Sequence, residues 1–289
     1  MTLPHGVRRV IVVILDGIRA DAIHLFPLPN LARLADQGAS TFTARTVTPS
    51  VTAAAMTSLF TGVSPDVHGL AHDRFSMPKA RARLTPVTRV LQRVGMPSSA
   101  HIAAIPHAYR ALARRIARSL GLERVTCSGS DAGGILSAAH ESLSRQRRGL
   151  ILLHWPDADR AGHAHGWNST AYAHSARQLD DTLGVLEQRY DIQHDPHTLV
   201  ILCADHGGGG LDPRDHNSLH PLDQRIPIIL LGGGVRRGPL LPQCSLLDIP
   251  ATICWILGAT PPASYTGRPL TQAFIGPDAE SPRMVAAVA

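Results

Sequence analysis

The chain has 289 residues, of which 44% are hydrophobic and 17% charged, so it can bury a large core and is expected to be globular. No apolar run reaches the roughly 18 residues that a membrane-spanning helix needs. The net charge of +6 comes mostly from Arg, but with only 4% aromatic residues the chain lacks the aromatic interleaving typical of nucleic-acid binding. We therefore expect neither a membrane nor a nucleic-acid polymer as a partner, and the oligomeric state is not predicted.

The first apolar run, residues 10–15, follows two arginines and ends in Asp-Gly. It is too short for the hydrophobic region of a secretory signal, and no small-residue cleavage site follows it. The run therefore predicts a first core strand, and the protein is expected in the cytoplasm.

Apolar runs and amphipathic stretches alternate along the rest of the chain. Strands are expected at residues 10–15, 40–47, 100–105, 149–154, 198–203 and 226–231. Helices are expected at residues 29–38, 53–60, 85–94, 108–120, 132–145, 169–190 and 247–258. This alternation predicts an α/β fold with a doubly wound, largely parallel central sheet flanked by helices. Because no repeat or linker interrupts it, residues 1–289 are expected to form a single domain.

Acidic and imidazole side chains stand where predicted strands end. Asp16 follows the first strand, and Asp205 and His206 follow another strand directly before four glycines. Ligand sites of open α/β sheets lie at the carboxyl ends of strands, and paired Asp and His suit zinc or a similar divalent ion. The simpler alternative is a strand end with a solvated Asp and a turn.

The segment PDADRAGHAHG follows the strand at residues 149–154. Asp159 and His163 are four residues apart, which places them on one face of a helical turn. Asp157 and His165 are competing ligands in the same segment, and spacing alone does not choose between them. A third imidazole is expected from His216 or His220. Three carboxylates and three imidazoles together suit two divalent ions that share a cleft.

Thr52 lies near the predicted N-terminus of the helix at residues 53–60, after Pro49. A hydroxyl at this position usually caps the helix. It can also act as a nucleophile, because the helix dipole favours an alkoxide and an anionic phosphoryl group there. The choice depends on whether metal ligands lie nearby.

Several motifs together resemble the alkaline phosphatase superfamily, and within it the nucleotide pyrophosphatase/phosphodiesterase (type I phosphodiesterase) branch. They are VVILDGIRAD, TPSVTAAAMTSLFTGVSPDVHGL, PDADRAGHAHG and ADHGGGG, with a later His before RIPIILLGGGV. The resemblance covers nearly the whole chain and is least diagnostic over residues 80–150.

The resemblance implies an alkaline phosphatase-like fold and a particular set of metal ligands. One ion is expected on Asp16, Thr52, Asp205 and His206, and the other on Asp159, His163 and a third histidine. His216 is favoured as that histidine because it stands ten residues before Ile-Pro, as in the family; His220 is the alternative. The ions are expected to be zinc, with manganese or iron as alternatives.

The implied activity is metal-dependent hydrolysis of a small-molecule phosphate ester, as a phosphodiesterase or nucleotide pyrophosphatase with some phosphomonoesterase capacity. Thr52 would attack phosphorus and form a phospho-threonine. Where relatives carry an Asn that contacts the phosphoryl oxygen, this chain has His72 and Asp73. His72 is therefore expected to bind substrate, and the alternatives are backbone N–H groups near Thr52 or the metals alone. Alternatives are a phosphomutase, a phosphonate or sulfate-ester hydrolase, and a non-catalytic binding module; no sulfatase motif surrounds Thr52.

Overall fold

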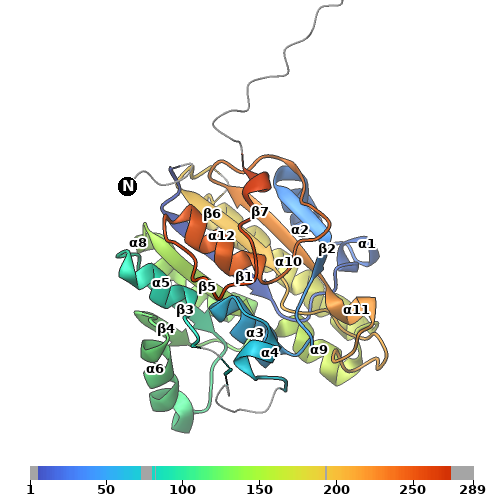
Figure 1. Ribbon diagram of the computed structural model, residues 1–289. Coiled ribbons are helices and arrows are strands. Elements are labelled where there is room, and N and C mark those ends of the chain that lie inside the picture. Colours follow the sequence, from blue (N-terminus) through green and yellow to red (C-terminus); the bar gives the residue numbers. More distant parts are fainter. Residues whose placement is uncertain (1–5, 73–79, 82, 193, 275–289) are drawn as a thin grey trace, which may run out of the picture.

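The computed structural model describes residues 6–72, 80–81, 83–192 and 194–274. Within these residues the centre is one sheet of eight strands in the order β4-β3-β5-β1-β6-β7-β2-β8 (Figure 1). The strands are β1 (Arg9–Leu15), β2 (Ala39–Arg45), β3 (Ser98–Ile102), β4 (Arg124–Cys127), β5 (Gly149–Trp155), β6 (Thr198–Cys203), β7 (Arg225–Gly232) and β8 (Gly238–Pro239).

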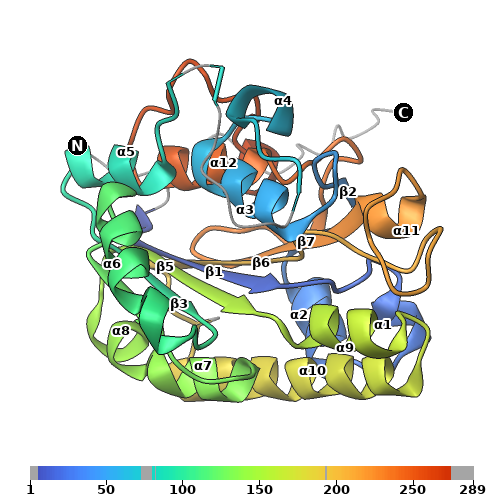
Figure 2. The same ribbon diagram turned by 90° about the horizontal axis from the view of Figure 1, so that it is seen from below.

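Helices cover both faces of the sheet. Figure 2 shows α3, α4, α5 and α12 over one face and α2, α7, α9 and α10 over the other. The α-helices are α1 (Ala22–Leu25), α2 (Pro29–Gln37), α3 (Thr52–Thr61), α4 (Pro65–His68), α5 (Val87–Arg93), α6 (Arg110–Ser119), α7 (Ala132–Ala138), α8 (His140–Arg145), α9 (Asp157–His165), α10 (Thr170–Tyr190), α11 (Pro221–Gln224) and α12 (Asp248–Ile256). Two 3₁₀ turns are η2 (His107–Tyr109) and η3 (Thr271–Ala273).

The sheet is parallel except at one strand. β1 pairs in parallel with both β5 and β6, whereas β7 runs antiparallel to its neighbours β6 and β2. Every residue of β1 and of β6 is buried, as expected for central strands with helices on both sides. The predicted doubly wound, largely parallel α/β fold is confirmed.

Several local features differ from the prediction, among them the short elements α1, α11 and β8, which were not expected. β4 was not expected, since its sequence RVTC is short and partly exposed at the sheet edge and contains no apolar run. The helix expected at residues 132–145 is instead two helices, α7 and α8, that meet at Ala139. Residues 63–70, where no helix was predicted, contain the short helix α4.

The order of the central strands decides where the predicted site residues lie. Ile14 of β1 is level with His154 of β5 on one side and with Cys203 of β6 on the other. The three strands therefore end at the same height, and Asp16 and Asp205 follow them on adjacent strands. No helix among the described residues is both long and apolar enough to cross a bilayer. The cytoplasmic location stays a prediction.

Candidate metal centre

Three imidazoles from separate segments meet beyond the carboxyl ends of β1, β5 and β6. His206 and His216 stack with ring centroids 3.7 Å apart and planes 9° apart. The Nε2 atoms of His216 and His163 are 3.1 Å apart. His163 comes from α9 and the other two from the loops after β6, so only the folded chain brings the three rings together.

The carboxylate of Asp159 lies among these rings. Its Oδ1 atom is 3.4 Å from Nε2 of His163, 3.8 Å from Nε2 of His216 and 3.9 Å from Nε2 of His206. Asp159 and His163 lie one turn apart in α9, as their spacing predicted.

Two further carboxylates approach His206 from the strand ends. Its Nε2 atom is 3.3 Å from Oδ1 of Asp16 and 3.4 Å from Oδ2 of Asp205. His206 and Asp205 are fully buried, and Asp16 is only 3% exposed, so the charges of both carboxylates are held away from water. Burying two carboxylates side by side is costly unless a cation compensates them.

Backbone contacts fix the proton position on all three imidazoles, because each Nδ1 lies against a carbonyl oxygen, which can only accept. The Nδ1 to oxygen distances are 2.8 Å from His206 to Gly207, 2.6 Å from His216 to Ser50 and 2.9 Å from His163 to Arg214. Each Nδ1 therefore carries the proton and donates it to the carbonyl, and each Nε2 presents a lone pair. Metal-binding histidines are usually oriented in this way.

The residues fit a divalent cation, because their acceptor atoms face one another without donors between them. The lone pairs of His216 and His163 point at each other across 3.1 Å. Oδ1 of Asp159 and Oδ2 of Asp205 are buried and have no hydrogen-bond partner in the described part of the chain. Burial raises the pKa of Asp159 and lowers the pKa of His216, so the metal-free site disfavours both charged forms. A bound cation would stabilise the ionised carboxylate of Asp159 and would accept the lone pair of neutral His216.

The ligand atoms fall into two groups, in each of which they lie within 4.8 Å of one another. The first group is Asp159, His206 and His216, and the second is Asp16, His154 and Asp205. His206 was expected with the second group; its Nε2 is nearer to Asp16 than to Asp159 and lies between the groups. His154 was not predicted as part of the site.

The hydroxyl of Thr52 belongs to the same cluster. Thr52 is the first residue of α3, and its Oγ1 is 3.0 Å from Nε2 of His206. The N-cap residue is Val51, and no side chain caps this helix. The hydroxyl is therefore directed at the cluster and does not have the capping role that was its simpler explanation.

The alternative ligands considered from the sequence lie elsewhere. Both carboxylate oxygens of Asp157 accept the backbone N–H of Ala132, at 3.2 and 3.0 Å, at the start of α7. Nδ1 of His220 accepts the N–H of Leu222 at 3.2 Å and so caps α11. His165, at the end of α9, is exposed.

The predicted substrate ligand His72 is exposed and makes no described contact with the cluster. Its neighbour Asp73 lies outside the described residues. The role of His72 stays a prediction.

Comparison with known proteins identifies the family. The profile of the family described as type I phosphodiesterase / nucleotide pyrophosphatase matches residues 10–229. The chain belongs to this family. The name of the family denotes hydrolysis of phosphodiester and pyrophosphate bonds, in agreement with the predicted class of enzyme.

Individual relatives support this assignment. An uncharacterized pyrophosphatase/phosphodiesterase of Schizosaccharomyces pombe is 27% identical over 236 residues, which cover 74% of this chain and 47% of the relative. The chain thus spans about half the length of that curated relative.

Solved structures show the same fold. Human ectonucleotide pyrophosphatase / phosphodiesterase 5 has a TM-score of 0.71 at 15% identity, covering 92% of this chain and 100% of that one. The phosphonate monoester hydrolase of Silicibacter pomeroyi has a TM-score of 0.65 at 16% identity, covering 95% and 78%. These neighbours confirm the predicted alkaline phosphatase-like fold.

The glycine run at residues 207–210 of this phosphodiesterase-family chain is needed mainly for close packing. A Cβ atom on Gly207 would lie 1.9 Å from the carbonyl oxygen of Leu222, and one on Gly208 would lie 2.1 Å from the ring of Trp167. Only Gly209 among the four has a left-handed backbone, with φ of 75°. Of the four, Gly209 is therefore the glycine that uses a backbone conformation other residues avoid.

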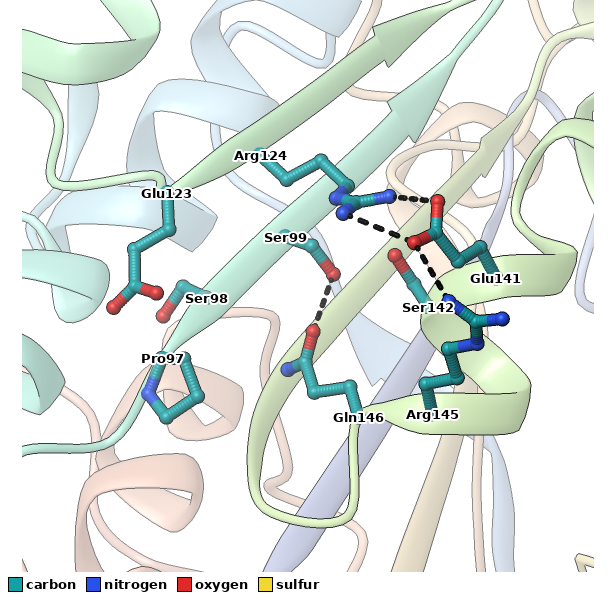
Figure 3. Close-up of a pocket in the computed structure, with 9 residues that line it drawn as sticks. All are labelled: Pro97, Ser98, Ser99, Glu123, Arg124, Glu141, Ser142, Arg145 and Gln146. Atoms are coloured by element: carbon teal, nitrogen blue, oxygen red, sulfur yellow. Dashed lines mark hydrogen bonds and ion pairs between the residues drawn. The ribbon is translucent and has the colours of Figure 1, made fainter.

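A separate hollow of about 370 Å³ lies at the amino ends of β3 and β4, the opposite end of these strands from the phosphodiesterase-family site (Figure 3). Three of its charged groups pair with one another, since Glu141 bonds Arg124 and lies 3.7 Å from Arg145. Ser99 donates to Gln146 across the same hollow at 3.0 Å. The converging acceptor atoms of the metal cluster have no counterpart among the residues drawn there.

Proposed function

We propose that the chain is a metal-dependent phosphoryl-transfer hydrolase that cleaves small phosphodiesters or nucleotide pyrophosphates, with some capacity for monoesters. The observation that carries this proposal is the position of the Thr52 hydroxyl. It lies at a helix N-terminus, 3.0 Å from Nε2 of His206, beside a cluster of carboxylates and imidazoles that is buried except at His163 and, in part, at Asp159. A hydroxyl in this setting is suited to attack phosphorus.

The chain offers ligands for two divalent ions, with zinc as the first expectation and manganese or iron as alternatives. Asp16, Thr52, Asp205 and His206 would hold one ion, and Asp159, His163 and His216 the other. Bound ions would polarise the phosphoryl oxygens and favour ionisation of the hydroxyl and of the attacking water.

The reaction follows in two displacements. Thr52 Oγ1 lies 3.0 Å from Nε2 of His206, which would share a bound ion with it. With the ion in place the hydroxyl would lose its proton to solvent, and the alkoxide attacks phosphorus. A bond forms between Oγ1 and phosphorus as the ester or anhydride oxygen departs, and that oxygen takes up a proton. Water then attacks the phospho-threonine, the bond between Oγ1 and phosphorus breaks, and the proton that the water loses restores the hydroxyl of Thr52. Two in-line displacements give net retention at phosphorus.

The N-terminus of α3 supports the first displacement. Thr52 is the first residue of this 10-residue helix, where the aligned backbone dipoles favour negative charge. The same electrostatic effect would stabilise the alkoxide and the incoming phosphoryl group. The buried walls of the site strengthen it, because the local dielectric is low.

The test compares Thr52→Ala and Thr52→Ser with wild type on bis- and mono-nitrophenyl phosphate, with zinc or manganese added. We expect Thr52→Ala to lose about 10⁴-fold or more in turnover, and Thr52→Ser to retain part of it, since Ser keeps the hydroxyl. Thr57→Ala is the matched control, because this hydroxyl lies in the same helix and donates to the carbonyl of Ala53. Equal turnover by wild type and Thr52→Ala would refute the covalent mechanism.

The same assay separates the alternative functions. The fold is shared with a phosphonate monoester hydrolase, so phosphonate and sulfate esters belong in the substrate panel. Faster turnover of either than of the phosphodiester would favour that alternative, and transfer within one molecule would indicate a mutase. A purified protein without bound metal, and without thermal stabilisation by added zinc or manganese, would favour a non-catalytic module.

A further inference from the structure

His154 lies beside the predicted ligands although no expectation placed it there. It is level with Ile14 in the neighbouring strand β1, so the two side chains point to the same face of the sheet. Asp16 comes two residues after Ile14 and shares that face. As a result, Nε2 of His154 is 3.1 Å from Oδ2 of Asp16.

This close approach is not an ordinary hydrogen bond. Nε2 of His154 is buried and has no hydrogen-bond partner among the residues that the structure describes. Oδ2 of Asp205 is also buried and also has no hydrogen-bond partner among those residues. Buried polar atoms of this kind are rare in folded proteins and call for an explanation such as a bound ion.

The neighbouring acceptors supply that explanation. The ligand atoms of Asp16, His154 and Asp205 all lie within 4.8 Å of one another. Their chemistry, two carboxylate oxygens and one imidazole nitrogen, is that of a site for a divalent transition metal. The three residues come from the ends of adjacent strands, so the rigid sheet holds them in place.

We propose that His154 is a further metal ligand, which donates Nε2 to the ion held by Asp16 and Asp205. This inference rests on the proposed two-metal function. It raises the number of chain ligands at that ion from four to five, together with Thr52 and His206. Zinc is usually four-coordinate, whereas manganese accepts six ligands. The fifth ligand therefore shifts the preference of this position from zinc toward manganese or iron.

The test uses the full chain, stripped of metal and titrated with Mn²⁺, Zn²⁺ or Co²⁺ alone. His154→Phe keeps an aromatic ring but removes both nitrogens. We expect it to weaken Mn²⁺ binding by about 10- to 100-fold and Zn²⁺ binding by less. We also expect its Co²⁺ complex to absorb more strongly in the visible range, because four-coordinate Co²⁺ absorbs more than five- or six-coordinate Co²⁺. His174→Phe, at an exposed position in α10, is the control and should change neither measurement.

Two results would overturn the proposal. Unchanged affinities and an unchanged Co²⁺ spectrum in His154→Phe would show that His154 is not a ligand. Weaker binding with an unchanged spectrum would show that it only positions Asp16. If the variant fails to fold, a crystal structure of the wild type with Mn²⁺ decides, since a ligating Nε2 must lie about 2 Å from the ion.

Different experimental results would overturn the His154 ligand and the proposed function. A wild type that binds metal and depends on Thr52 for turnover, with no effect of His154→Phe, overturns the His154 ligand alone. A wild type that binds none of the three ions overturns both.

Discussion

The two ends of strand β1 both bury charged side chains, but they do so in opposite ways. At the amino end, Arg9 is only 3% exposed and all three of its guanidinium nitrogens donate. The acceptors are Thr198 Oγ1, the carbonyl oxygens of Leu143 and Gln146, and Asp195 Oδ2. At the carboxyl end, Asp16 lies 3.1 Å from Nε2 of His154 and 3.3 Å from Nε2 of His206. Nε2 of His154 and Oδ2 of Asp205 beside it have no hydrogen-bond partner among the described residues.

The difference indicates what each end is for. A cluster in which every donor meets an acceptor is complete and serves the stability of the fold. A buried cluster with an excess of acceptors is incomplete and is suited to bind a cation. The four predictions that follow test this contrast.

The largest effect is expected from Asp205→Asn at the carboxyl end. Asn keeps the oxygen that accepts the backbone N–H groups of Gly17 and His206, but removes the negative charge. We expect kcat/KM to fall by about 10³-fold or more with loss of bound metal, because metal ions contribute several kcal/mol to such reactions. The metal-free variant should be at least as stable as wild type in urea. A large loss of stability without metal would break the comparison.

At the amino end, Arg9→Met should act in the reverse manner. It leaves the carbonyl oxygens of Leu143 and Gln146 and the hydroxyl of Thr198 without their donor, so we expect a loss of about 3 kcal/mol in the free energy of unfolding. Metal affinity should not change. Urea denaturation and a metal titration measure the two quantities, and weaker metal binding in this variant would show that the two ends are coupled.

His101 provides a buried imidazole outside both clusters. It is 1% exposed, neither ring nitrogen has a hydrogen-bond partner in the described residues, and burial, aided by Arg124, lowers its pKa from 6.5 to about 4. Between these values the unfolded chain binds a proton that the folded chain does not. The free energy of unfolding should therefore fall as pH drops from 6.5 toward 4, by up to about 3 kcal/mol.

His101→Leu should remove that part of the pH dependence, because Leu cannot be protonated. Urea midpoints of metal-free wild type and variant between pH 4 and 7 give the difference. An identical pH dependence in both proteins would contradict the prediction.

The smallest effect is expected at His220. His220→Ala removes the acceptor of the Leu222 N–H at the start of α11, which should cost about 1 kcal/mol of stability and leave metal affinity unchanged. His216→Ala should instead abolish binding of one ion. Reversal of these two results would make His220 the ligand.

The sequence predicted the central strands well because burial on both faces leaves a readable apolar run. β1, β5 and β6 were found in this way, and so was β7. An apolar run does not encode direction, so the antiparallel course of β7 was not predicted. β4 was missed because an edge strand buries too little to require such a run.

The candidate site was predicted to the extent that polar residues interrupt those runs. Asp16 and Asp205 stand just after their strands, whereas His154 lies inside β5 and was read as part of it. The sequence feature that could have identified His154 as a site residue is its position, as a polar residue, next to the end of a buried strand. Spacing could not choose between Asp157 and Asp159, since the choice depends on the distant N-terminus of α7, where Asp157 accepts the N–H of Ala132.

The three carbonyl groups that orient the imidazoles differ in how far their residues can be changed. Every amino acid has a carbonyl oxygen and Arg214 is exposed, so a substitution there keeps the acceptor for His163. Ser50 is buried and its hydroxyl also donates to the carbonyl of His216, and any larger residue at Gly207 would collide with the backbone of Leu222. Two of the three nitrogen lone-pair directions are therefore tied to small residues.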